Sequence, residues 1–232
     1  MNKEKIKKIF KWIFDSYIWL GVLLLILDIV SKNIVVQNAD AIKNGGGLNG
    51  GVDIIPGFLG INYLINEKIA FGLTIANSQV TQIIFSIVAV LVAVAIIIYL
   101  VKQWGKTNRF YRASLIMVVV GALGNVIDRI FYSAEYLNYY NASHELARGV
   151  VDWIDFYGIW GFNFNIADVS VVVAAFMMII YMIVTEIIAY NKKRKEEVST
   201  SNDKPKQEEK VLSQTEQEKR RLLEEEKVDK DE

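Results

Sequence analysis

The chain has 232 residues, of which 53% are hydrophobic, and its 26 basic and 26 acidic residues leave no formal net charge. The absence of cysteine excludes disulfides, thiolate nucleophiles and cysteine-ligated metals, and the single histidine excludes sites that need several histidine ligands. A balanced charge also argues against a partner that is a nucleic acid. Residues 191–232 alone hold 12 basic and 13 acidic residues, so residues 1–190 are strongly apolar.

Four apolar segments are long enough to cross a bilayer, because a hydrocarbon core of about 30 Å needs about 20 apolar residues as a helix. They are roughly Trp12–Val30, Val80–Val101, Ala113–Phe131 and Ile166–Tyr190. Lysines precede the first segment, as in a signal peptide. No cleavage site of small residues follows it, however, and we interpret it as an uncleaved anchor.

The basic residues predict the orientation, because lysine and arginine gather in the short cytoplasmic loops of membrane proteins. Five lysines precede the first span, four basic residues link the second span to the third, and another basic cluster follows the fourth span. The other two loops, residues 31–79 and 132–165, are poor in basic residues. Both termini are therefore expected in the cytoplasm, with these two loops outside.

The outer loops contain segments that are typical of short strands or interfacial pieces. Ile54–Ile65 and Phe156–Phe164 mix aromatic, β-branched and glycine residues. The expected fold class is therefore a membrane all-α protein with a small β element, in which an extracytoplasmic β-cradle accompanies four transmembrane helices. Residues 1–190 form the membrane domain. Residues 191–232 form a charged cytoplasmic tail, expected to be disordered or a solvated helix, without chemistry of its own.

This topology brings four carboxylates to one depth, at the outer membrane face: Asp28, Asp128, Asp152 and Asp168. A charge within a span costs about 2.5–3.5 kcal/mol on insertion scales, so a layer of carboxylates indicates a polar pocket. Two adjacent carboxylates share a proton. The ionised one can take a proton from water while the protonated one donates its own, which permits amide hydrolysis without a metal.

Helical spacing supplies partners for these carboxylates. Residues three or four apart share a helix face, which places Asn125 beside Asp128 and Asn165 beside Asp168, and which allows Asp28 to pair with Lys32. Arg129 lies at the membrane edge, where it is expected to neutralise a nearby carboxylate. Gly121 and Gly124 thin one side of the third span and allow a neighbouring helix or a ligand to approach closely.

Five stretches of the chain, taken in order, resemble the motifs of lipoprotein signal peptidase (signal peptidase II), a family of aspartyl proteases of bacterial inner membranes. They are DIVSK at 28–32, Asn66 with AFG at 70–72, GALGNVIDR at 121–129, VVDWIDF at 150–156 and FNIAD at 164–168. The chain departs from the family at Lys68 and Val120, where glycine is usual, and in an apparent insertion at residues 132–149.

The resemblance implies a role for each site residue. It implies a catalytic pair, Asp152 and Asp168, with substrate-binding or supporting positions and structural polar positions around it. The supporting positions are Asn66, Asn125, Arg129 and Asn165, and the structural positions are Asp28, Lys32 and Asp128. The implied substrate is a prolipoprotein that carries diacylglyceryl on a cysteine, cut before that cysteine at the extracytoplasmic face of the inner membrane. The resemblance implies no cofactor and no metal.

Alternatives stay open at this stage. Asp155 competes with Asp152 for the catalytic role, and Asn125 and Asn165 are equally well explained as inter-helix hydrogen-bond donors. A small transporter that uses the same carboxylates would need polar groups through the whole bilayer depth, and the second span has none at its centre. A membrane scaffold would depend on its tail and not on Asp168. His144 is expected at the surface, and the sequence leaves the oligomeric state open.

Overall fold

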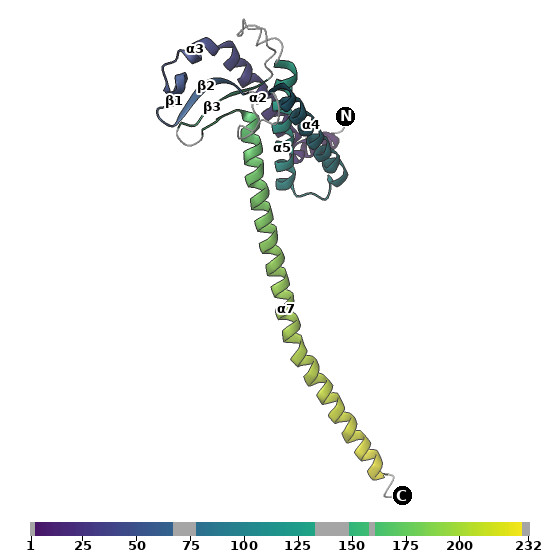
Figure 1. The fold of residues 1–232 in the computed structure, drawn as a ribbon. Coiled ribbons are helices and arrows are strands. Elements are labelled where there is room, and N and C mark those ends of the chain that lie inside the picture. The colour runs from purple at the N-terminus through teal and green to yellow at the C-terminus, as the bar shows by residue number, and fades with distance from the viewer. Residues whose placement is uncertain (1–2, 67–77, 133–148, 158–160, 229–232) are drawn as a thin grey trace. The chain divides into compact units, whose positions relative to one another are not determined.

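The structure, a computed structural model, describes residues 3–66, 78–132, 149–157 and 161–228 (Figure 1). It contains four helices that are long and apolar enough to cross a membrane, Ile18–Gln37, Gln82–Gln103, Arg109–Ile130 and Ile166–Glu197. A small antiparallel sheet accompanies them. The expected fold class, four apolar helices with a small β element, is confirmed.

The chain forms two compact units, residues 1–179 and 180–232. The fourth apolar segment belongs to a long helix, α7 (Ile166–Val228), which passes through both units and includes most of the expected charged tail. The division of the chain at residue 190 stays a prediction. Several expectations concern positions outside the described residues: Lys68, the AFG motif at 70–72, His144, and residues 133–148 of the apparent insertion.

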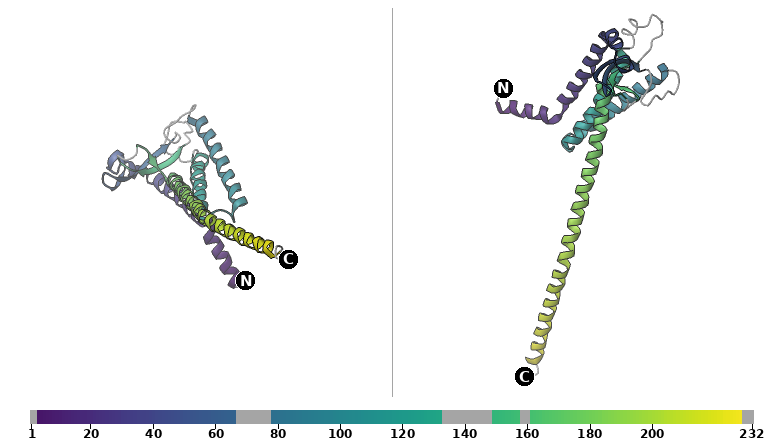
Figure 2. Two further views of the ribbon diagram at one scale, coloured as in Figure 1. Left: turned by 90° about the horizontal axis from the view of Figure 1, so that it is seen from below. Right: turned by 90° about the vertical axis from the view of Figure 1, so that its left-hand side faces the viewer.

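The first span is displaced along the sequence from the predicted Trp12–Val30. The helix α1 (Lys3–Ser16) ends before Tyr17, whose φ of 61° lies in the left-handed region, and α2 (Ile18–Gln37) begins directly after it. A non-glycine residue in this conformation interrupts a right-handed helix. The two helices therefore meet at an elbow, which is visible where the purple end of the chain turns in Figure 2.

The second and third spans form a helical pair. The helix α4 (Ser78–Gln103) leads through a short connection into α5 (Arg109–Ile127), which packs against both α4 and α2. Asn108 caps α5, because its side-chain oxygen accepts a hydrogen bond from the backbone N–H of Phe110 at 2.8 Å. At its other end α5 continues into a π-helical turn, η3 (Asp128–Tyr132), a type of turn that is frequent at functional sites.

The small elements between and after these helices form a sheet with two short helical pieces, where the sequence predicts a β-cradle. The helical pieces are α3 (Ala39–Lys43) and the 3₁₀ turn η1 (Leu48–Gly50), and the strands are β1 (Val52–Ile55), β2 (Leu59–Asn66), β3 (Val150–Asp155) and β4 (Asn163–Phe164). The strand order is β1-β2-β3-β4, antiparallel throughout.

The β expectation for Ile54–Ile65 is confirmed, since this segment covers the end of β1, the turn after it and nearly all of β2. The expectation for Phe156–Phe164 holds only for its last two residues among those described. The longer strand lies before it, where the β-branched Val150 and Val151 open β3 and pair with β2.

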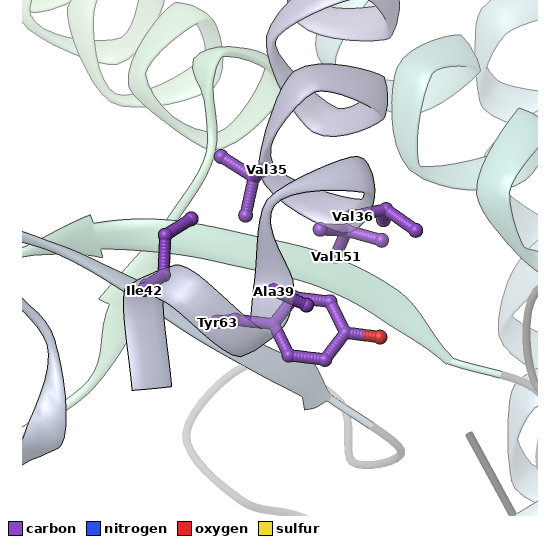
Figure 3. Packing of buried hydrophobic residues seen from close by; sticks show 6 residues of the cluster. All are labelled: Val35, Val36, Ala39, Ile42, Tyr63 and Val151. Carbon is purple, nitrogen blue, oxygen red and sulfur yellow. The ribbon is translucent and has the colours of Figure 1, made fainter. Parts of the chain in front are cut away.

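A cluster of buried apolar side chains joins the sheet to the end of α2 (Figure 3). It consists of Val35, Val36, Ala39, Ile42, Tyr63 and Val151. Because side chains alternate across a strand, the burial of Val151 in this cluster directs its neighbour Asp152 to the opposite face of the sheet. Apolar packing thus fixes the direction of a carboxylate that the sequence singles out.

The glycines of α5 permit the close helix packing expected from the sequence. A Cβ atom on Gly124 would lie 2.7 Å from Oδ2 of Asp28 in α2 and 2.8 Å from the Cβ of Ala167 in α7. A Cβ on Gly121 would collide with the side chain of Val171. The three helices approach one another here because these two positions carry no side chain.

We therefore expect Gly124→Ala to lower the stability of the protein, since the added methyl group separates α5 from both neighbouring helices. Overpacking of this kind costs about 1–3 kcal/mol, which corresponds to several degrees in the melting temperature measured in detergent. Gly105→Ala is the matched control, because no atom lies within 4 Å of the Cβ position there. Equal melting temperatures for the two variants would contradict the tight packing.

Candidate active site

The four carboxylates expected at one depth do lie together, at the end of the helices that carries the sheet. Asp28 and Asp128 are fully buried, Asp152 is 1% exposed and Asp168 is partly buried. All four belong to one network of hydrogen bonds that connects α2, α5, β3 and α7. The layer of carboxylates that the sequence predicts is therefore a hydrogen-bonded cluster built from separate elements of the fold.

The first turn of α7 supplies one of the proposed catalytic carboxylates through a capping box. Oδ1 of Asn165 accepts a hydrogen bond from the backbone N–H of Asp168 at 2.9 Å. In return, Oδ2 of Asp168 accepts one from the backbone N–H of Asn165 at 3.2 Å. The spacing Asn-x-x-Asp before an apolar run is a readable signal for this motif. From the sequence we predict that the two residues share a helix face, but we do not predict the cap.

Asp28 contributes to the same helix end from a distant part of the chain. Its Oδ1 accepts a hydrogen bond from the backbone N–H of Ala167 at 2.8 Å. The first N–H groups of a helix have no partner within the helix. Asp28 satisfies one of them and so attaches the start of α7 to the middle of α2.

Lys32 is the cation at the centre of the network, and its side chain is fully buried. Its Nζ lies 2.7 Å from Oδ2 of Asp28 and 3.0 Å from Oδ2 of Asp128. It also donates a hydrogen bond to Oδ1 of Asn125 at 3.3 Å. The expected pairing with Asp28 is confirmed. The ion pair with Asp128 joins two helices that are distant in sequence, and no local pattern reveals it.

Asp152 is held by amide groups. Its Oδ2 accepts a hydrogen bond from Nδ2 of Asn66 at 2.8 Å, and its Oδ1 accepts one from Nδ2 of Asn165 at 2.7 Å. Asn66 pairs with Val150 in the antiparallel ladder of β2 and β3, so it lies diagonally opposite Asp152 on the same face of the sheet. The register of the two strands therefore fixes the first of these contacts.

Asn125 and Asn165 connect the two candidate catalytic carboxylates. Nδ2 of Asn125 donates to Oδ1 of Asp168 at 2.7 Å, and Oδ1 of Asn125 accepts from Nδ2 of Asn165 at 3.1 Å. Asn165 also touches Asp152, as described above. The two asparagines thus join helices, as one interpretation of the sequence holds, and they also contact both members of the proposed catalytic pair.

Arg129 and Asp155 differ from the other candidates in their contacts. Nη1 of Arg129 donates to the backbone oxygen of Asn125 at 3.5 Å, and its Nε is buried without a hydrogen-bond partner. Among the described residues Arg129 makes no direct ion pair, so the expected neutralisation acts only through longer-range attraction. Asp155 accepts a hydrogen bond from Asn49 at 3.0 Å. It lies three residues beyond Asp152, on the other face of β3.

Burial and a neighbouring charge change the acidity of Asp152. Removal from water raises the pKa of this carboxyl group most, and the negative charge of Asp168 raises it further. The amide donors Asn66 and Asn165 act in the opposite direction, because they stabilise the ionised form. The outcome is a pKa of about 7, so Asp152 is able to hold a proton near neutral pH.

An apolar groove on the helices includes one of the candidate site residues, Arg129, in its lining. It has a volume of about 310 Å³ and is lined by residues of α4, including Gln82, Ser86 and Leu91, and by Val126, Arg129 and Ile130. Arg129 therefore borders the groove and also contacts the backbone of Asn125, which belongs to the carboxylate network. An extended apolar ligand in the groove would bring its polar end to Arg129.

We expect Lys32→Met to destabilise the protein strongly, because it leaves the buried Asp28 and Asp128 without their cation. Loss of one partner from a buried ion pair costs about 3–5 kcal/mol, and the change should appear in the melting temperature. Combining Lys32→Met with Asp28→Asn and Asp128→Asn should recover part of the loss, because no unpaired charge remains. A control is Lys7→Met, whose ion pair with Glu4 is solvent-exposed. A melting temperature for Lys32→Met that matches this control would refute the importance of the buried cation.

Comparison with known proteins agrees with this arrangement. The family model for signal peptidase (SPase) II matches residues 20–184. The lipoprotein signal peptidase of Fusobacterium nucleatum is 34% identical over 67% of this chain and 78% of its own length. That of Clostridioides difficile is 36% identical over 68% of this chain and 87% of its own length.

Solved structures agree as well. A bacterial membrane enzyme structure determined at 2.3 Å resolution matches with a TM-score of 0.54 and 27% identity, over 72% of this chain and 87% of that one. A second structure, at 1.9 Å resolution, matches with a TM-score of 0.53 and 28% identity, over 72% of this chain and 92% of that one. Since the family model covers most of the chain, including the whole carboxylate network, this protein belongs to the signal peptidase II family.

Proposed function

We propose that this chain is an aspartic endopeptidase that removes signal peptides from prolipoproteins, with Asp152 and Asp168 as its catalytic pair. The observation that carries the proposal is the position of Asn165, which contacts Asp152 through its side chain and Asp168 through its backbone N–H and side-chain oxygen. One residue touching both carboxylates holds them around a common space. The relatives named lipoprotein signal peptidase support the choice of substrate.

The reaction follows from one proton shared by two carboxyl groups. The ionised carboxylate takes a proton from a water molecule, whose oxygen attacks the scissile carbonyl carbon, while the protonated carboxyl group donates its proton to the carbonyl oxygen. The tetrahedral intermediate then collapses. The C–N bond breaks as the amide nitrogen receives the proton that the first carboxylate took from water, and the second carboxylate takes a proton back from a hydroxyl group of the intermediate. This step releases the signal peptide and a new N-terminus and restores the single shared proton.

Asp152 is a better candidate than Asp155 for the carboxyl group that acts together with Asp168. Asp152 shares the amide network of Asn66 and Asn165 with Asp168, whereas the carboxylate of Asp155 contacts Asn49 in the outer 3₁₀ turn. The two side chains also point to opposite faces of β3. Asn66, Asn125 and Asn165 position the carboxylates, and Arg129 is placed to bind a carbonyl oxygen or ester group of the substrate.

The same proposal assigns a location and a route of entry. The distribution of lysine and arginine supports a cytoplasmic position for both termini. In that orientation the sheet and the carboxylates lie at the extracytoplasmic face of a bacterial inner membrane. The substrate is a prolipoprotein with diacylglyceryl on the cysteine after the cleaved bond. The apolar groove between α4 and α5 faces the lipid and leads to Arg129, which suits a ligand that arrives through the bilayer.

We expect Asp152→Asn and Asp168→Asn each to reduce cleavage of a diacylglyceryl-modified peptide in detergent by about 10²- to 10⁴-fold, since each removes one of the two proton-transfer groups. The matched control is Asp155→Asn, a change of the same type in the same strand, which should retain most of the activity. Melting temperatures near that of the parent chain would show that the inactive variants are folded.

Other outcomes would decide against this function. Full activity in Asp168→Asn would exclude Asp152 and Asp168 as the catalytic pair. Loss of activity in Asp155→Asn alone would show that Asp155 is the catalytic residue of β3. A chain truncated after Lys195 should cleave the peptide at nearly the parent rate, whereas the scaffold alternative requires the tail. The transporter alternative predicts no peptide cleavage by any of the variants or by the parent.

The pH dependence should follow the raised pKa of Asp152. At a pH below about 7 this group keeps its proton, and the pair holds the single proton that the mechanism needs. As the pH rises above about 7 that proton is lost, so kcat/KM should fall about tenfold per pH unit. The control is Asp155→Asn, which should show the same alkaline limb. A rate that stays constant up to pH 9 would exclude Asp152 as the proton donor.

A further inference from the structure

The N-terminal helix α1 and the elbow after it are not explained by the family's activity. They precede residue 20, where the family match begins. The helix is amphipathic: Ile6 and Ile13, seven residues apart, share one face, whereas Lys7 and Lys11 occupy another. Its five lysines outnumber its two acidic residues.

The elbow contains an apolar groove. The turn at Tyr17 sets α1 at an angle to α2, and between them lies a hollow of about 370 Å³. Its lining is almost entirely apolar and includes Trp12, Ile13, Trp19 and Val22. Trp12 is 54% exposed and Val22 is 52% exposed, so an apolar ligand can reach the groove.

Contacts with the start of α5, and with Trp104 in the connection before it, hold the elbow in place. Nη2 of Arg109 lies 2.9 Å from Oδ2 of Asp15, and Nη1 of Arg112 donates to the backbone oxygen of Asp15 at 3.2 Å. The rings of Trp12 and Trp104 lie 6.0 Å apart between their centroids. The groove is therefore fixed to the end of α5 that lies opposite the carboxylates.

We propose that this elbow is a binding site for an anionic phospholipid of the cytoplasmic leaflet, with an acyl chain in the groove and the phosphate near the lysines of α1. The tryptophan rings match the membrane interface, where amphipathic rings gather. The lysines complement a negative headgroup, and the apolar face of α1 rests on the acyl region. Glu4 offsets one of these lysines, Lys7, whereas Asp15 pairs with Arg109 of α5, so α1 keeps an excess of positive charge.

The site can be tested by fluorescence quenching in nanodiscs that contain the full chain. The chain has no cysteine, so Ile13→Cys offers a single position for a bimane label within the groove, and Lys11→Cys offers one on the opposite face. Two discs of equal composition are compared, with the bromine atoms carried by the acyl chains of phosphatidylglycerol in one and of phosphatidylcholine in the other.

We expect the label at Ile13 to be quenched more strongly by brominated phosphatidylglycerol, by up to about fivefold, the enrichment expected for one lysine at an anionic surface. The label at Lys11 should be quenched weakly by both lipids. Replacing all five lysines of α1 by glutamine, with the label at Ile13, should remove the preference for phosphatidylglycerol while the melting temperature stays within a few degrees.

Two results would overturn the proposal. Equal quenching of the Ile13 label by the two brominated lipids would show that the groove does not select an anionic phospholipid. Free access of aqueous iodide to that label in every lipid mixture would show that α1 does not lie on the membrane. Its apolar face would then be a surface for a soluble protein partner.

Discussion

A single buried ammonium group, that of Lys32, is the constraint on which the site depends. A fully buried cation is tolerated only with oppositely charged partners close by, and Lys32 meets this condition through Asp28 of α2 and Asp128 at the end of α5. Each of these carboxylates also binds another element. Asp28 caps α7 by accepting a hydrogen bond from the backbone N–H of Ala167, and Oδ2 of Asp128 accepts one from the backbone N–H of Val151 in β3 at 3.0 Å. One charge thereby positions every element that carries a proposed catalytic group.

The same network explains how four carboxylates at one depth differ in role. Asp28 and Asp128 contact an ammonium group directly, so one positive charge offsets part of their negative charge, which fits the structural role expected for them. Asp152 and Asp168 are held by amide N–H groups of asparagines, which orient a carboxylate without cancelling its charge. Neighbouring uncompensated carboxylates repel each other and favour a shared proton. The raised pKa of Asp152 is the consequence that fits acid–base chemistry.

The sequence predicts the parts of this structure that depend on local or periodic information. Apolar length gives the four spans, and spacing of four gives the Asp28–Lys32 pair. The contact of Lys32 with Asp128 depends on how α2 and α5 pack, which no local pattern encodes. The break at Tyr17 is equally hidden, because tyrosine has no turn preference and the apolar residues continue on both sides of it. The capping box of Asn165 and Asp168, by contrast, has a local signature in the sequence, Asn-x-x-Asp before an apolar run.

The helix α5 links the elbow to the carboxylate network, because it contacts one at each of its ends. At one end Arg109 and Arg112 contact the elbow through Asp15, and at the other Asn125 leads to Asp168. A helix of 19 residues is about 28 Å long and transmits a displacement with little deformation. Attachment of α1 to one membrane surface would therefore fix how deep the carboxylates lie relative to the other. For an enzyme whose proposed substrate is itself anchored in lipid, that depth decides whether the scissile bond meets the catalytic pair.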